Sequence, residues 1–190
     1  MKKLLSLVLA AMLCLCALMP AVAETAVETF PYTMQTYRMY FDVLAANLLQ
    51  VQPQWEMDAT GAKYIVTVGN YGVVEVEVDA QGGVIALTTV SEFSMSNGEL
   101  QEKSNNFGMV CALVALTSKA AEDINGFTED KINSVTQELV GMIQELSTGF
   151  DKMDGTPYII EREVDGNLCA FMAMINTQKL TLTFGFTMKP

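Results

Sequence analysis

Residues 73–79, which read Val-Val-Glu-Val-Glu-Val-Asp, decide the fold class of this chain. Val74, Val76 and Val78 alternate with acidic residues, as in a β-strand that buries one face and exposes the other to solvent. Two further β-branched, apolar runs flank this segment across glycine-containing turns: residues 64–68 and residues 84–90. The middle of the chain therefore predicts an antiparallel meander.

A second acidic strand is predicted near the C-terminus. Residues 159–165 read Ile-Ile-Glu-Arg-Glu-Val-Asp, and Asp165-Gly166 is a strong signal for a two-residue hairpin. Further strands are expected at residues 168–175 and 180–188. Since both acidic segments follow a helical region and turn into an apolar strand, we consider a degenerate duplication with halves 24–103 and 104–190. The alternative is that half-buried strands share this alternation without common origin.

Helical periodicity predicts three helices. Apolar residues recur at three- and four-residue spacing from Met34 until shortly before Pro53. A second helix is predicted over residues 104–121, and its stretch from Phe107 to Leu116 is apolar nearly all round, which favours a buried helix. Thr128 is a natural N-cap for a third helix that Gly149 closes.

These elements predict the α+β class: an antiparallel sheet of about six to seven strands, with about three helices on one face and carboxylates on the other. The length suits a single domain over residues 24–190.

The N-terminus has the pattern of a secretory signal peptide. Lys2 and Lys3 precede an apolar run over residues 4–19, and Ala21-Val22-Ala23 forms a small-residue cleavage site before Glu24. The run is too short for a resident membrane helix. We therefore expect removal of residues 1–23 and a bacterial protein that is secreted or associated with the cell envelope.

The four cysteines fall into two groups. Cys14 and Cys16 lie in the apolar run after leucines rather than small residues, so we expect no lipoprotein modification. Cys111 and Cys169 remain after cleavage. They could form a disulfide outside the cytoplasm, or both be buried thiols, and the sequence does not decide between these alternatives.

The chain is strongly acidic, with 22 Asp and Glu against 11 Lys and Arg and a net charge of −11. Loss of residues 1–23 removes two lysines and brings the net charge to −13. Such a surface repels nucleic acid and anionic lipid, and it favours basic or cationic partners. No later segment is long and apolar enough to span a bilayer.

The chain contains no histidine, which excludes the usual triads and the usual general base at neutral pH. The motifs G-x-S-x-G, G-x-x-x-x-G-K and C-x-x-C are also absent. Carboxylate pairs remain, since residues two apart on a strand lie about 6.5–7 Å apart, within the range that glycosidases use. The candidate catalytic residues are Glu75, Glu77, Glu161 and Glu163; the simpler interpretation is a solvated strand face.

Metal sites have little support in the sequence. Asp79 and Asp165 each lie at a glycine turn, where they could contribute to weak calcium binding, but neither turn has the D-x-D-x-D-G ladder. Met172 and Met174 share a strand face, although methionine far more often fills a core than binds copper. We expect no cofactor and no dedicated metal site.

The sequence favours an exported, non-enzymatic binding or interaction protein, with a protein, peptide or glycan as partner. One alternative is an extracytoplasmic, glycosidase-like hydrolase that uses the carboxylates named above. Another is an envelope-associated structural or chaperone-like module in which the apolar helix at 104–121 contacts a partner or a second copy.

Overall fold

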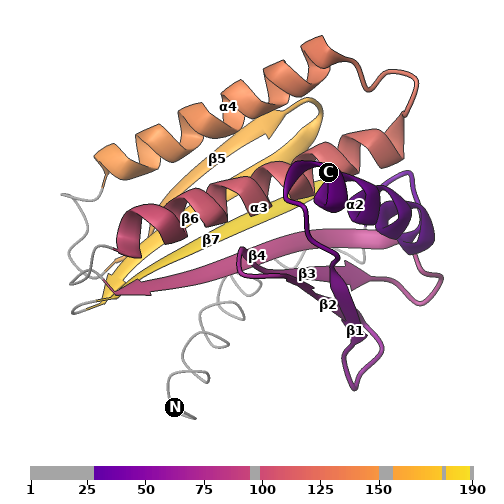
Figure 1. Cartoon of the computed structure of the whole chain (residues 1–190), viewed down its shortest axis with the longest axis horizontal. Helices are drawn as coiled ribbons and strands as arrows, with labels where there is room; N and C mark the ends of the chain where they lie inside the picture. The colour runs from indigo at the N-terminus through magenta and orange to yellow at the C-terminus, as the bar shows by residue number, and fades with distance from the viewer. Residues whose placement is uncertain (1–27, 95–98, 150–155, 177–178, 189–190) are drawn as a thin grey trace, which may run out of the picture.

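The computed structural model describes residues 28–94, 99–149, 156–176 and 179–188. Over these residues the chain forms three helices and one seven-stranded antiparallel sheet in the order β1-β2-β3-β4-β7-β6-β5 (Figure 1). The helices are α2 Met34–Leu48, α3 Glu99–Glu122 and α4 Glu129–Thr148. The strands are β1 Gln54–Met57, β2 Lys63–Val68, β3 Gly72–Val78, β4 Val84–Ser94, β5 Tyr158–Val164, β6 Asn167–Asn176 and β7 Lys179–Met188. The α+β prediction is confirmed. The expected signal peptide, with Cys14, Cys16 and the Ala23–Glu24 cleavage site, lies outside the described residues.

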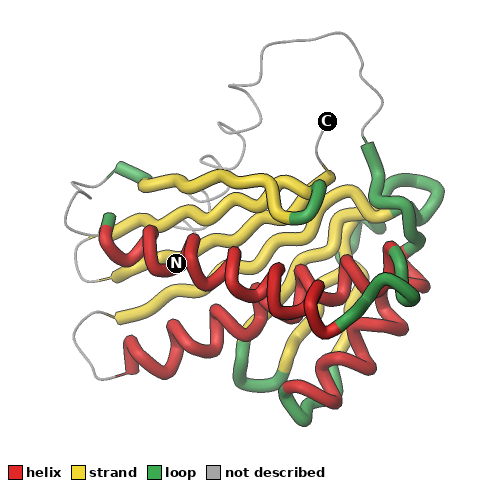
Figure 2. Tube along the Cα trace, turned by 90° about the horizontal axis from the view of Figure 1, so that it is seen from above, coloured by secondary structure: helices red, strands yellow, loops and turns green. Residues whose placement is uncertain are grey.

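All three helices lie on the same side of the sheet (Figure 2). The helix α3 packs on β3, β4 and β7, while α4 packs on β5 and β6. Apolar side chains from alternate strand positions fill the space between the layers, and Phe171 and Phe184 meet there with ring centroids 4.7 Å apart. The burial of this one face stabilises the two-layer arrangement.

The ends of two predicted helices differ from the sequence interpretation. The first helix ends at Leu48, before Pro53 is reached, and Gln50 adopts a left-handed conformation with φ of 56°. The second begins at Glu99 rather than near residue 104, because Glu-Leu-Gln-Glu-Lys at 99–103 are all good helix formers. The proposed boundary between residues 103 and 104 therefore falls inside α3.

Six of the seven strands are arranged symmetrically about the β4–β7 pair, with β3 and β2 on one side and β6 and β5 on the other, while β1 adds an edge strand beyond β2. The two acidic segments with similar sequences, 73–79 and 159–165, correspond to β3 and β5. These strands do not occupy equivalent places, because β3 lies next to β4 whereas β5 is at the edge. The likeness of these two sequences is therefore not matched by their places in the sheet, and the duplication stays a prediction.

Two local predictions are confirmed in detail. The hydroxyl of Thr128 accepts a hydrogen bond of 3.3 Å from the backbone N–H of Lys131, which caps α4. Asp165 and Gly166 have φ of 50° and 82°, as a type I′ hairpin turn requires, and they connect β5 to β6.

Candidate functional site

The four candidate glutamates all lie on the sheet face opposite the helices. Glu75 and Glu77 alternate with buried valines on β3, while Glu161 and Glu163 alternate with buried residues on β5. Three strands, β4, β7 and β6, separate the two pairs. At about 4.8 Å per strand spacing, the pairs lie roughly 19 Å apart. The four carboxylates therefore do not converge in one cleft, and form instead two acidic borders of one surface.

An uncharged area lies between these borders, which we call the central strip. It consists of three open-face residues from each of the middle strands, in three rows across the sheet. All nine are at least partly buried, and Thr88, Gly185 and Ala170 form the middle row. The members are Ala86, Thr88 and Val90 on β4, Thr183, Gly185 and Thr187 on β7, and Leu168, Ala170 and Met172 on β6.

The middle row joins the two borders directly. Glu75 pairs with Thr88, Thr88 with Gly185, Gly185 with Ala170, and Ala170 with Glu161. These three central residues are small, and a side-chain carbon placed on Gly185 would meet no other atom within 4 Å. The middle row is therefore a shallow floor, and the described helices lie on the other side of the sheet (Figure 2).

Two apolar side chains extend the uncharged area at one end. Ile159 on β5 pairs with Met172 and is 42 % exposed, and Val73 on β3 is 39 % exposed. Positive charge on this face is limited in the described residues: Lys63 forms a 3.3 Å ion pair with Glu75, and Lys179 forms one with Glu92. The face thus combines an uncharged centre, in which three of the nine residues are threonines, with a net negative margin.

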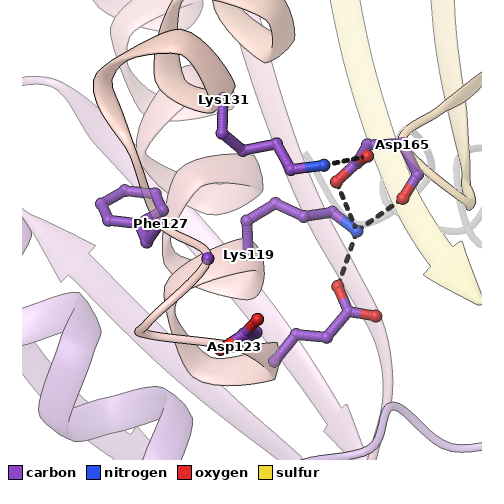
Figure 3. A pocket seen from close by; sticks show the side chains of 7 residues that line it. Lys119, Asp123, Phe127, Lys131 and Asp165 are labelled. Carbon is purple, nitrogen blue, oxygen red and sulfur yellow. Dashed lines mark hydrogen bonds and ion pairs between the residues drawn. The ribbon is translucent and has the colours of Figure 1, made fainter.

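A separate pocket of about 280 Å³ lies where the end of α3, the start of α4 and the β5–β6 hairpin meet (Figure 3). Lys119 is only 5 % exposed there, and its ammonium group donates to Glu122 at 2.6 Å and to the carbonyl oxygen of Asp165 at 2.7 Å. Lys131 donates to the carboxylate of the same aspartate. A buried ammonium needs such partners, because an uncompensated charge is costly there.

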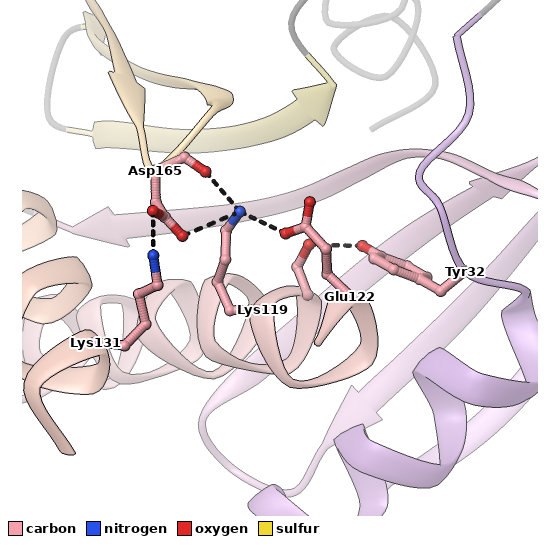
Figure 4. Close-up of polar contacts among 6 residues, drawn as sticks. Tyr32, Lys119, Glu122, Lys131 and Asp165 are labelled. Atoms are coloured by element: carbon pink, nitrogen blue, oxygen red, sulfur yellow. Dashed lines mark hydrogen bonds and ion pairs between the residues drawn. The ribbon is translucent and has the colours of Figure 1, made fainter. Parts of the chain in front are cut away.

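The electrostatics of this cluster keep Asp165 ionised. Burial favours its neutral form, but the hydrogen bond from Lys131 and the charges of both lysines outweigh that effect, so the pKa of Asp165 lies below its ordinary value of 3.8. Nearby, Tyr32 and Ser118 share a buried 2.6 Å hydrogen bond, and burial raises the pKa of Tyr32 far above its usual range (Figure 4). The lysine contacts connect α3 and α4 to the β5–β6 hairpin, and the Tyr32–Ser118 hydrogen bond connects the segment before α2 to α3.

The aspartates considered for calcium have other partners. Asp165 binds the two lysine ammonium groups, as described above. Asp79 accepts hydrogen bonds from the backbone N–H groups of Gln81 and Gly83, at 2.9 and 2.7 Å, and so closes its own turn. Over the part of the chain that the structure describes, no group of three or more acidic or cysteine side chains is placed to hold a metal ion.

Cys111 on α3 and Cys169 on β6 are buried free thiols in the structure. Of the two alternatives that the sequence left open, the structure therefore has the buried thiols and not the disulfide. Burial raises the pKa of Cys169 to about 12 and that of Cys111 well above its ordinary value. Because the thiolate is the reactive species, neither side chain is a good nucleophile at neutral pH.

Sequence reasoning missed Lys119 and Lys131. The available signal was Lys119 itself, a charged residue inside a segment predicted to be a buried helix. Such a position implies a compensating carboxylate. Its partner Asp165 is distant in the sequence, so the pattern alone could not identify it.

No helix among the described residues combines the length and the apolar character that a membrane crossing needs. The chain matches no protein-family model, no curated protein and no solved structure.

Proposed function

We propose that this chain is an exported, non-enzymatic binding protein, and that the open face of its sheet binds a basic partner. The observation that carries the proposal is the uncharged central strip between two acidic borders, which no described element covers. Exposed apolar area with a charged margin is typical of interaction surfaces. The signal-peptide pattern supports a location outside the cytoplasm, in the medium or at the cell envelope.

The charge of the face supports a cationic partner. The borders carry Glu75 and Glu77 on one side and Glu161 and Glu163 on the other, within a chain of net charge −11. Complementary charges increase the rate of encounter and reject partners of the same sign. An anionic partner would meet repulsion from both borders.

Two features count against the alternatives drawn from the sequence. A glycosidase-like site would need carboxylates within about 5–9.5 Å in a cleft, whereas the β3 and β5 pairs lie on opposite borders and none of the four lines the pocket near Lys119. The chaperone-like alternative relied on the apolar helix at 104–121, but α3 buries its residues from Val110 to Ala120 almost completely inside the domain.

The test is to measure binding of a fluorescent, lysine-rich peptide to residues 24–190 and to two double variants. Glu75→Gln with Glu161→Gln neutralises one residue of each border. Glu102→Gln with Glu138→Gln removes the same charge from exposed positions on α3 and α4. We expect the border variant to bind several-fold more weakly, with a smaller dependence on salt, and the control to bind like the parent. Equal effects of the two variants, or no binding by the parent, would contradict the proposal.

A further inference from the structure

We propose that the central strip binds a single amphipathic, cationic helix of a partner protein, with its axis along β4, β7 and β6. This inference rests on the proposed function and specifies the ligand of the same face. Three observations lead to it: the hydrogen-bonding state of the middle strands, the dimensions of the strip, and the sign of charge on both borders.

The middle strands offer no backbone groups to a ligand. Each of β4, β7 and β6 pairs with a strand on both sides, so its N–H and C=O groups are used within the sheet. An extended segment lying on this face would lose water from its own backbone groups and gain few partners, at a cost for each group. A helix satisfies its backbone internally and can present apolar side chains alone. The face therefore selects a helix over an extended peptide.

The dimensions of the strip fit one helix. Two strand spacings, about 10 Å, separate β4 from β6, which is close to the roughly 10–12 Å diameter of a helix with its side chains. The strip positions of β7, from Thr183 to Thr187, cover roughly 13 Å, the length of about nine helical residues. Gly185 and Ala170 at the centre allow close approach, and Met172 can adapt its shape to the incoming side chains.

The borders determine the polar pattern of the ligand. With the helix axis above β7, Glu75 and Glu77 lie on one flank and Glu161 and Glu163 on the other, each about two strand spacings away. Lys or Arg residues on both sides of an apolar stripe can extend their long stems to these carboxylates. A second copy of this chain fits poorly, because two such faces would bring four acidic borders together.

The probe is a synthetic peptide of about 18 residues with leucines at i, i+3, i+4 and i+7 and lysines on both flanks. A second peptide has the same composition and charge but has its leucines distributed around the helix. The protein variants are Gly185→Trp, which fills the open floor, and Thr67→Trp, which places the same side chain at an exposed open-face position on β2, outside the strip. Ala170→Arg tests the floor independently, and circular dichroism with thermal unfolding checks that each variant is folded.

We expect the amphipathic peptide to bind at least about tenfold more tightly than its rearranged form and to lose at least about tenfold in affinity to Gly185→Trp or Ala170→Arg. Thr67→Trp should bind like the parent, and the bound peptide should gain helical signal. If both peptides bind equally and depend only on the glutamates, the helix inference is wrong while the proposed function stands. If neither peptide binds the parent, the proposed function itself is wrong.

Discussion

Lys119 and Asp165 are 46 residues apart in the sequence, yet the lysine ammonium group donates to the aspartate carbonyl at 2.7 Å and lies 3.4 Å from its carboxylate. The contact joins the end of α3 to the β5–β6 hairpin, and Lys131 adds the start of α4 (Figure 4). That hairpin carries one acidic border and one column of the central strip. The ion-pair cluster therefore positions one side of the proposed binding face.

Breaking this cluster should destabilise the domain. Asp165→Asn keeps a residue that tolerates the left-handed turn conformation, but it leaves the buried ammonium of Lys119 with less compensation. We expect the free energy of unfolding to fall by about 2–3 kcal/mol, measured by urea denaturation. Lys179→Met, which removes an exposed ion pair with Glu92, serves as the control and should change it by less than about 1 kcal/mol. Equal effects of the two substitutions would show that the cluster has no structural role.

The contribution of Asp165 should depend on pH in a defined direction. Its folded pKa is lower than the ordinary value of 3.8, so its stabilising effect is complete above that value and is lost as the pH falls through the folded pKa. The difference in unfolding free energy between the parent and Asp165→Asn should therefore be constant from neutral pH to about pH 5 and shrink below about pH 4. If the difference in unfolding free energy between the two proteins became smaller as the pH rose from acid to neutral, the stabilising role of the ionised Asp165 would be contradicted.

Cys111 and Cys169 should be free thiols that react only slowly with thiol reagents in the folded protein. In residues 24–190, Cys111 and Cys169 are buried with raised pKa values, so an aromatic disulfide reagent should label the folded protein slowly. Unfolding without reductant should expose both thiols to fast labelling. If the unfolded, unreduced protein shows no free thiol, the disulfide alternative is correct.

The N-cap of α4 should contribute measurably to stability. Thr128→Ala removes the acceptor for the Lys131 N–H and should lower the free energy of unfolding by about 0.5–2 kcal/mol. Thr128→Ser retains the hydroxyl group and should therefore keep most of the stability that the alanine variant loses. A serine variant as unstable as the alanine variant would indicate that the cap hydrogen bond is not the cause.

Local patterns were sufficient for most of the elements and for the class of the fold. Alternating valines predicted β3, and the Thr128 cap and the Asp165-Gly166 turn were correctly placed, because these features depend on neighbouring residues. The start of α3 was missed since a polar, exposed first turn has no apolar periodicity. The strand β1 is only four residues long and was not identified separately.

The proposed binding face could not be predicted in the same way. Glu75 and Glu161 were both predicted to be exposed, but whether they share a cleft depends on the strand order, which is a long-range property. The central strip exists only because β7 lies between β4 and β6, so that Gly185 falls between Thr88 and Ala170. Nothing in the local sequence of β7 specifies those neighbours.

The most direct test is an NMR titration of isotope-labelled residues 24–190 with the amphipathic, lysine-flanked peptide. We expect the largest chemical-shift changes on Thr88, Gly185 and Ala170, with smaller changes at Glu75 and Glu161 on the two borders. The proposal is contradicted if saturating peptide leaves these resonances unchanged, or if the changes are confined to the helical side of the sheet.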